Sequence, residues 1–586
     1  MKNFFCSVSL LLLPTIGFAQ STWYVDQSGN GDFTSIQKAI NTVPYGDIVI
    51  VRDGTYFENL EFNYAAVILR SENGPASTII DGSQAGPVIW FTDWTDDAVV
   101  DGFTITNGRS TNGGGIECRF GDTSPTIINN VISQNTALWH GGGIYFEDES
   151  HSLISGNTIS GNVALAGDGG GVYGGFTAVD ITLTNNTIFD NVSQGSGGGI
   201  FFTHSSPTIS GNTIFENSAT QGKGGGLCIS SPGAWHRNII VEDNSFLRNH
   251  AEGSGGGIAI VDISAASSGS ARYITGNIIQ GNSSMGDGGG IFLEESSLRI
   301  SQNEVSYNSS GGDAGGIYCY WFSSPLIDSN LLLGNVSLGF GGAISCKNQS
   351  DPFIDRVTAF GNLALKRGGG LHCRNNSNPT ITNSIFWENA APKSAEFYFD
   401  AVSPTVLYSD VKGGWAGVGN IDSDPIFVSG FYLSQTSAGQ VSESPCIDAG
   451  DPSSSLPSTT TRTDGVLDSL IVDMGYHHQG PPSAGPTLVI TNLISGQVAK
   501  IGMSQCTPYG KTVLAYSLAG GGPINTPYGP GYVSKPYQLL NLTCDSNGDA
   551  SLTQLVPSGM TGTQIWFHGA DLGTATMLNP IAATIY

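Results

Sequence analysis

A small group of basic residues contains the side chains of this chain that are best suited to catalysis or to binding an anion. The chain carries 48 acidic and only 22 basic residues, for a net charge of -26. Against that background, one short stretch holds Lys347, Arg356, Lys366, Arg367 and Arg374. Lys347 and Arg374 stand out as candidate catalytic residues, because they occupy equivalent positions of neighbouring sequence repeats, 27 residues apart.

Two like charges held one repeat apart repel each other unless an anion lies between them. Lys347 and Arg374 could therefore grip the carboxylate of a uronic acid. One of them could instead act as the base of a lyase that removes the proton beside that carboxylate. The alternative is that these cations only protect a surface, paired with acids such as Asp351 and Asp355.

Two carboxylates suggest a metal site. Asp287 and Asp313 each precede a small-residue run in adjacent repeats, and Asp168 holds the same position farther back. Paired carboxylates can begin a Ca²⁺ site, which would let an acidic protein hold an acidic glycan. The sequence offers no complete ligand set, so solvated turn acids are the alternative.

Three aromatic residues suggest carbohydrate binding. Tyr145, Tyr173 and Phe201 occupy one column in three successive repeats. If their rings face outward, they form a strip about 10 Å long on which sugar rings can stack through CH and π contacts. Ordinary packing between strands is the alternative, because aromatic residues are common in strands.

All these residues are placed by a repeat that returns ten times between Gly113 and Asn389. Each unit has a glycine-rich run, an aliphatic residue, a polar turn and an apolar run ending in Asn, at spacings of 26 to 33 residues. So regular a period indicates stacked units. The closing residues are Asn135, Asn162, Asn191, Asn217, Asn249, Asn282, Asn308, Asn335, Asn362 and Asn389. An earlier Asn of each unit forms the first column, which runs from Asn130 to Asn330 and breaks at Val357 and Ser384, and the closing residues form the second.

Each unit also alternates between buried and variable positions. The aliphatic residue and the residue two places later are apolar, as in Ile144 and Phe146, whereas the residue between them varies. Apolar residues at every second position, with variable residues between them, are typical of a strand that buries one face. Two more short strands follow in each unit. Such strands bury no face alone, so copies must stack about 4.8 Å apart. The predicted fold is an all-β, single-stranded parallel β-helix in which the Asn amides form ladders.

The chain divides into four predicted parts. Residues 1–19 have the pattern of a secretory signal peptide, with one Lys, an apolar stretch and a small residue at the end. Residues 20–480 form the β-helix, regular over 113–389 and irregular in the closing segment 390–480. Residues 481–486 are a Gly- and Pro-rich linker. Residues 487–586 have the turn-rich alternation of a small antiparallel β-sandwich.

A short helix is expected to cap the first coil. Phe33, Ile36 and Ile40 lie on one helical face, Thr34 and Gln37 form a capping-box pattern, and Pro44 ends the helix. Covering an open end protects unpaired strand edges.

Charge and cysteine content exclude several classes of function. A strongly acidic chain repels nucleic acids and anionic lipids, and no later run reaches the roughly 18 apolar residues of a membrane span. Eight Cys follow the signal peptide without the CxxC spacing of a zinc site. We therefore expect a secreted or cell-surface protein that does not span the membrane.

Three segments carry a family resemblance. The run GDFTSIQKAI at 31–40, followed by DGTY at 53–56, resembles the opening of pectin esterases and their relatives. The repeats resemble the GGxI and FxxN phrases of polymorphic outer-membrane proteins, and SPCIDAGD at 444–451 is similar to the closing segment of exported bacterial β-helix proteins. Together they resemble the right-handed parallel β-helix superfamily that contains pectate lyases, which implies that fold. The catalytic motifs of pectate lyases, polygalacturonases and pectin esterases are not found in the sequence.

Two functional hypotheses remain. The first is a noncatalytic exported scaffold or adhesin whose long face binds polysaccharide or a cell-surface glycan. The second is a polysaccharide lyase, or another pectin-type glycan-degrading enzyme acting on uronate polymers, that uses Lys347 or Arg374 as the base and is assisted by Ca²⁺. The sequence favours the first, because it lacks a complete catalytic set.

Overall fold

The structure is a computed structural model. It describes residues 20–585 except for 93–94, 96, 122, 148–149, 176–179, 232–237, 264–269, 481–486, 505, 508–509, 522–523, 527–528, 546–547, 573–575 and 579–580. The expected signal peptide, 1–19, and the expected linker, 481–486, lie outside the described residues.

One sequence repeat forms one coil of four short strands. A typical coil contains β12 (Thr126–Ile128), β13 (Val131–Ser133), β14 (Thr136–Ala137) and β15 (Ile144–Glu147). Three strands of each coil were expected. The strand equivalent to β14 was not, because two residues are too few for an alternating pattern to show.

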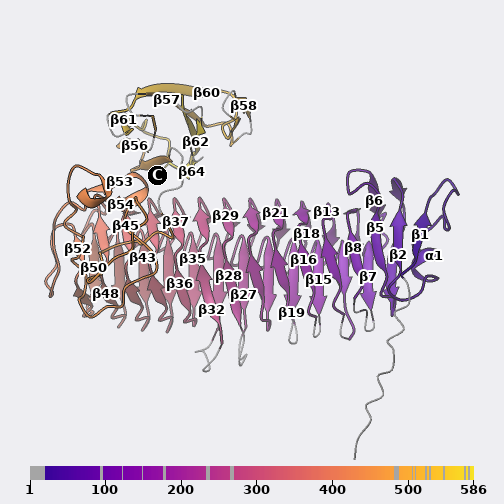
Figure 1. Cartoon of the computed structure of the whole chain (residues 1–586). Coiled ribbons are helices and arrows are strands. Elements are labelled where there is room, and N and C mark those ends of the chain that lie inside the picture. Colours follow the sequence, from indigo (N-terminus) through magenta and orange to yellow (C-terminus); the bar gives the residue numbers. More distant parts are fainter. Residues whose placement is uncertain are drawn as a thin grey trace, which may run out of the picture.

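The coils stack into four long parallel sheets (Figure 1). Among the described residues, sheet A has fifteen strands from β1 (Thr22–Val25) to β51 (Thr405–Leu407), and sheet B has fourteen from β3 (Gly54–Tyr56) to β52 (Asp410–Val411). Sheet D has ten, from β10 (Arg109–Ser110) to β46 (Leu363–Ala364). The thirteen strands of sheet C are β4 (Leu60–Asn63), β7 (Ile89–Thr92), β11 (Ile116–Cys118), β15, β19 (Val172–Gly175), β23 (Ile200–Thr203), β27 (Leu227–Ser230), β31 (Ile258–Val261), β35 (Ile291–Glu294), β39 (Ile317–Tyr320), β43 (Ile344–Lys347), β47 (Leu371–Arg374) and β50 (Phe397–Asp400). This arrangement confirms the parallel β-helix.

The strands pair in register, so equivalent residues of successive coils form columns. Tyr145 pairs with Tyr173, and Ile144 with Val172. Ile144 and Phe146 pack in the interior core, whereas Tyr145 belongs to a separate apolar cluster on the outside of sheet C. Each fully buried aliphatic side chain contributes about 1.5–3 kcal/mol, so this continuous core is the main source of stability. Cys319, Cys346 and Cys373 fill one interior column as buried free thiols.

Both predicted Asn ladders are present at the turns. Along each ladder, the side-chain Nδ2 of one Asn donates to Oδ1 of the next at 2.8–3.1 Å. The first ladder ends at Asn330, and beyond it the backbone N–H of Val357 donates to the Ser384 hydroxyl at 3.1 Å. The second ladder ends at Asn389, whose Nδ2 donates to Oε2 of Glu396 at 2.5 Å. These bonds satisfy polar groups that would otherwise be buried without partners.

The N-terminal end is capped by a helix, as predicted. Helix α1 (Ile36–Ile40) buries Ile36, Ala39 and Ile40 against the first coil. The expected N-cap, Thr34, is wrong: Ser35 accepts a hydrogen bond from the Lys38 N–H at 3.3 Å. The Glu58 carboxylate, from the next coil, accepts from the N–H groups of Ile36 and Gln37. Glu58, which is distant in sequence, therefore accepts hydrogen bonds from the free N–H groups of the first helical turn, where a local capping box was expected to do so.

The chain closes the other end with short elements and then forms a small β domain. The closing segment contains β53 (Phe427–Val428), η1 (Ser429–Phe431), β54 (Tyr432–Leu433) and η2 (Thr436–Ala438). Cys446 and Met474 from this segment pack on Ile385 of the last coils. The antiparallel strands that follow are β55 (Thr487–Thr491), β56 (Val498–Ser504), β57 (Lys511–Ser517), β58 (Ile524–Thr526), β59 (Gly529–Gly531), β60 (Tyr537–Thr543), β61 (Ala550–Leu555), β62 (Gln564–Asp571), β63 (Thr576–Met577) and β64 (Ile581–Thr584).

These strands form the small antiparallel domain that the sequence predicted. One sheet has the order β55-β56-β61, and the other is built around β57 and β62. The domain, which we call the C-terminal module, lies along one long side of the rod near its C-terminal end (Figure 1).

Candidate functional site

The predicted catalytic and metal residues meet on the outside of sheet C. Lys347 and Arg374 are register partners in β43 and β47, which confirms that they share a column. Nη2 of Arg374 forms an ion pair with Oδ2 of Asp313 at 2.7 Å. Asp313 in turn donates its backbone N–H to Oδ1 of Asp287 at 2.7 Å. Residues from two separate sequence hypotheses therefore belong to one site.

Five cations form a basic patch over aromatic rings at this site. Its members are Lys347, Lys366, Arg367, Arg374 and Lys393, each with its charged group 4.6–5.6 Å from a ring centroid. The rings are those of Tyr320, Phe340 and Tyr398. Within the described part of the chain, only Arg374 of these five makes an ion pair. An aromatic face attracts a cation without neutralising it, so the patch keeps positive charge on an acidic protein.

The floor of the patch contains polar groups without partners. The outward column of sheet C here runs Tyr318, Ser345, His372 and Tyr398. The hydroxyl oxygens of Tyr318 and Ser345, Nδ1 of His372 and Nε of Arg374 are buried and make no hydrogen bond to any described residue. Leaving a buried polar group unpaired costs about 1–3 kcal/mol. These four groups lie beneath the cations of the patch, closed to solvent.

Burial sets the protonation of the site. It raises the pKa of the Asp287 carboxyl above its ordinary value, although Lys347 and Arg374 oppose the rise. It lowers the pKa of His372 to about 3, helped by the charges of Arg374 and Arg367. The imidazole of His372 is therefore neutral near pH 7, and its ring stacks between Phe340 at 4.5 Å and Tyr398 at 5.7 Å.

An aromatic turn borders the patch. Trp321 and Phe322 follow β39 and are 44% and 55% exposed, and the Trp321 ring meets Tyr320 edge-on at 5.8 Å. Their backbones are left-handed, with φ of 49° and 58°. The matching turns of the next two coils hold Asn348, Gln349, Asn375 and Asn376 in that conformation. Asn tolerates it, whereas a bulky residue there costs about 1–3 kcal/mol. The turn thus holds two large rings in solvent at the border of the patch.

The three residues predicted to bind carbohydrate form a stack that is closed to solvent. The rings of Tyr145 and Tyr173 stack at 5.2 Å, and those of Tyr173 and Phe201 at 5.4 Å, as the register required. They are only 1%, 3% and 8% exposed, so the expectation of an outward strip is not met. The physical reason is that turn side chains fold over them. His140 stacks on Tyr173 at 4.5 Å, and Arg119 lies over Tyr145.

The predicted calcium pair, Asp287 and Asp313, already has partners on the protein. Oδ1 of Asp313 accepts the backbone N–H of Phe340 at 3.1 Å, and its other oxygen binds Arg374. Among the described residues, no three His, Cys, Asp or Glu side chains come together as a metal-binding group. The chemistry of the site is thus that of carboxylates orienting cations, and Ca²⁺ binding stays a prediction.

Sequence reasoning assigned some residues to the wrong place and missed others. Arg356 was grouped with Lys347, but it lies at sheet A, paired with Asp328 at 2.8 Å and Asp355 at 3.1 Å. Lys393 was missed because it follows Asn389, where the repeat ends. Phe340 was missed because it takes the turn position held by Asp287 and Asp313 in the preceding repeats; its aromatic side chain is the signal that could have identified it.

Comparison with known proteins agrees with the observed architecture. A family model described as "Right handed beta helix region" matches residues 48–246. The chain is a right-handed parallel β-helix protein. Within the part that the structure describes, this β-helix protein contains no helix that is long and apolar enough to cross a membrane.

Two curated relatives share short segments with this β-helix protein. One, "Probable pectinesterase 67" of Arabidopsis thaliana, is 43% identical over 67 residues, which cover 10% of this chain and 19% of the relative. The other, "Probable pectinesterase 29" of Arabidopsis thaliana, is 39% identical over 64 residues, with the same shares of each chain. The chain thus spans about a fifth of the length of these relatives. So limited a likeness agrees with the fold but assigns no reaction, because function depends on the site.

Proposed function

We propose that this protein is an exported, noncatalytic scaffold that binds an acidic polysaccharide along the basic patch of sheet C. The observation that carries the proposal is the set of four cations, Lys347, Lys366, Arg367 and Lys393, that lie over aromatic rings without a carboxylate partner among the described residues. In a chain of net charge -26, such a patch is the place where an anionic polymer is attracted rather than repelled.

The geometry also suits a sugar polymer in particular. Carboxylates or sulfates would lie against the cations, and the exposed rings of Trp321 and Phe322 would stack on sugar faces at the border of the patch. The stacked coils keep these groups at fixed spacings, which favours an extended, repetitive ligand.

A noncatalytic role is supported by the state of Arg374. An arginine guanidinium stays protonated in proteins and cannot take up a proton as a base. The ion pair with Asp313 at 2.7 Å holds Arg374 as a positioning cation. Of the two predicted bases, only Lys347 therefore remains chemically suitable.

Binding to charged polymers tests the proposal. In the variant Lys347→Gln, Lys366→Gln, Lys393→Gln, three patch charges are removed without breaking a described ion pair. We expect its affinity for polygalacturonate, alginate or chondroitin sulfate to fall by about tenfold, since exposed ionic contacts contribute about 0.2–1 kcal/mol each. The matched control, Lys38→Gln, Lys511→Gln, Lys535→Gln, removes three exposed lysine charges elsewhere, also without breaking a described ion pair, and should bind as the wild type does. Equal binding by the two triple variants would refute the proposal.

A uronate lyase is the second candidate function. It is favoured by Lys347, an amine that makes no ion pair with any described residue, and by the short likeness to proteins named as pectinesterases. In that case Lys347 in its neutral form would take the C5 proton next to the uronate carboxylate, while Arg374 neutralises that carboxylate. The C4=C5 double bond would form as the C4–O bond breaks, and the sugar on the leaving oxygen would depart after that oxygen takes up a proton. The unsaturated product absorbs in the ultraviolet. Its appearance with wild type and its loss in Lys347→Ala would establish the lyase, whereas binding without product would exclude it.

A further inference from the structure

A second candidate site lies far from the basic patch, between sheet B and the C-terminal module. Among the described residues, the module is anchored to coils in the C-terminal half of the β-helix. There, the backbone N–H of Ile490 in β55 donates to the Tyr307 hydroxyl at 3.0 Å, and Leu488 and Ile490 pack with Leu331 and Leu333 of the β-helix. The two surfaces fit closely at this anchor, where only a cavity of about 20 Å³ remains.

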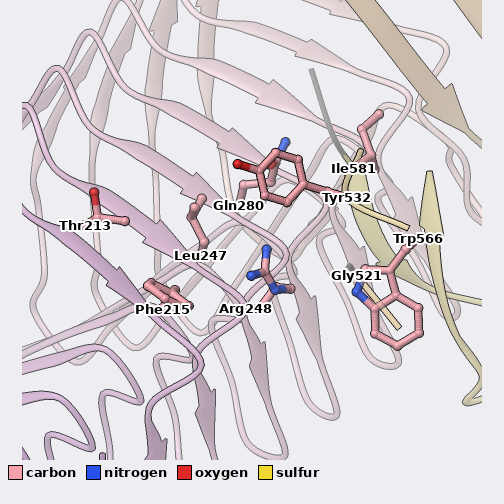
Figure 2. A pocket seen from close by; sticks show the side chains of 9 residues that line it. All are labelled: Thr213, Phe215, Leu247, Arg248, Gln280, Gly521, Tyr532, Trp566 and Ile581. Carbon is pink, nitrogen blue, oxygen red and sulfur yellow. The ribbon is translucent and has the colours of Figure 1, made fainter. Parts of the chain in front are cut away.

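Toward the N-terminal coils the same two surfaces separate. They leave an open cavity of about 400 Å³, which we call the interdomain cleft (Figure 2). Its floor includes Phe215 of β25 (Thr213–Phe215), Arg248 just after β29 (Ser245–Leu247), and Gln280 of β33 (Ile278–Gln280). Its roof includes Gly521, Tyr532 and Trp566 of the module. This volume lies within the range typical of small-ligand pockets, about 300–1,000 Å³.

The aromatic groups of the floor are firmly held. The Phe215 ring stacks on Phe189 of the preceding coil at 4.8 Å with an angle of 5° between the planes. The Arg248 guanidinium lies 6.0 Å from the Phe215 ring and forms an ion pair with Glu216 at 2.8 Å. The floor is thus a flat, preorganised aromatic surface next to a planar donor.

The roof brings two further rings over this floor. A Cβ atom at Gly521 would lie 2.9 Å from Nε1 of Trp566, so this glycine lets the indole lie against the backbone. Tyr532 is 43% exposed, and its backbone N–H donates to Nδ1 of His568 at 2.9 Å, which fixes the base of its side chain. Figure 2 shows the Tyr532 ring beside Gln280, with the Trp566 indole farther along the roof.

We propose that the interdomain cleft binds a neutral sugar, one or two pyranose rings of a glycan. Aromatic rings on two sides match the apolar faces of a pyranose, and Arg248 and the Gln280 amide supply planar hydrogen-bonding groups for its hydroxyls. Because Glu216 offsets the charge of Arg248, the cleft favours a neutral ligand over an anionic one. This site is independent of the function proposed above, which concerns an acidic polymer on sheet C.

Ligand binding in the interdomain cleft should be coupled to the docking of the C-terminal module. Floor and roof belong to different parts of the chain, so a bound sugar must hold the module against the β-helix. Ligand binding should therefore raise the thermal stability of the module, since any ligand that binds only the docked arrangement stabilises it.

Titration of tryptophan fluorescence with neutral gluco-, galacto-, manno- and xylo-oligosaccharides tests the proposal on the full chain. We expect binding by wild type and at least about tenfold weaker binding by Phe215→Ala and by Trp566→Ala. Trp139→Ala, which removes an indole that is 53% exposed elsewhere on the β-helix, is the matched control and should bind normally. The triple Lys→Gln variant of the basic patch should also bind neutral sugars normally.

Two results would overturn the proposal. The first is that no neutral saccharide in the panel binds the wild type. The second is that Phe215→Ala and Trp566→Ala bind as tightly as the Trp139→Ala control. Weaker binding by Phe215→Ala cannot be attributed to misfolding of the module, because this substitution changes the floor of the cleft and leaves every residue of the module intact.

Discussion

Replacing Asn217 with Ala tests whether the second Asn ladder carries the stability attributed to it. Asn217 is 1% exposed and lies in the middle of the ladder. Its Nδ2 donates to the carbonyl oxygens of Ile188 at 2.9 Å and Phe215 at 3.1 Å, and to Oδ1 of Asn249 at 3.0 Å. Its Oδ1 accepts from the backbone N–H and the Nδ2 of Asn191, at 3.1 and 2.9 Å.

The substitution removes all five of these hydrogen bonds and leaves the backbone N–H of Asn191 buried without an acceptor. A buried hydrogen bond contributes about 0.5–1.5 kcal/mol net, and such contributions are not fully additive within a network. We therefore expect Asn217→Ala to reduce local stability by about 4 kcal/mol.

Hydrogen–deuterium exchange is the appropriate assay, because a stacked rod can open coil by coil and need not unfold in one step. The opening free energy should fall at the amides of Asn191 and Asn217 and recover in distant coils. Asn185→Ala is the matched control, since Asn185 is an exposed turn residue with φ of 55°. It should lose only about 1 kcal/mol, the cost of Ala in the left-handed conformation. Equal losses in the two variants would refute the reasoning.

Two further predictions concern pH and the aromatic turn. Burial raises the pKa of Glu396 from an ordinary value of 4.5 to about 8, so the folded protein binds this proton more tightly than the unfolded chain does. The stability that this group contributes should be fully present below pH 4.5 and be lost as pH rises toward about 8. Glu396→Gln should abolish that decline in urea titrations at several pH values, and an unchanged decline would contradict the assignment. Trp321→Asn should leave stability equal or about 1 kcal/mol higher yet weaken retention on acidic polysaccharide. Phe120→Asn, at another exposed left-handed position with φ of 66°, should change stability similarly without affecting retention, and loss of retention in both variants would argue against a local binding role.

The fold was predictable because in-register stacking turns sequence columns into spatial ones. Equivalent positions such as Lys347 and Arg374 necessarily become neighbours once strands pair without offset. The same logic correctly predicted the Asn ladders, including the break at Val357 and Ser384. Alternation likewise separated the buried Ile144 from the outward Tyr145.

The site was less predictable because it depends on turn side chains that do not repeat. Whether Tyr145 and Tyr173 face solvent is decided by Arg119 and His140, and the equivalent positions of the next coil hold Glu147 and Asp168 instead. The contact between Arg374 and Asp313 joins residues 61 positions apart, across more than one coil, through the reach of a long side chain. The sequence repeat predicts which residues are neighbours within a column along the rod, but it does not predict contacts between side chains of different columns.

The direction of the Asn ladders has a consequence for how such a protein changes its length. Along each ladder the side-chain amide of an Asn donates to the Asn of the next coil, and its oxygen accepts from the Asn of the preceding coil, so successive coils make the same ladder contacts. Only the final partner, the Glu396 carboxylate, is different in kind. Whole coils can therefore be duplicated or deleted within 113–389 while both termini of the rod keep their chemistry. Gain or loss of whole repeats in the gene would lengthen or shorten the β-helix without requiring new capping contacts at either end.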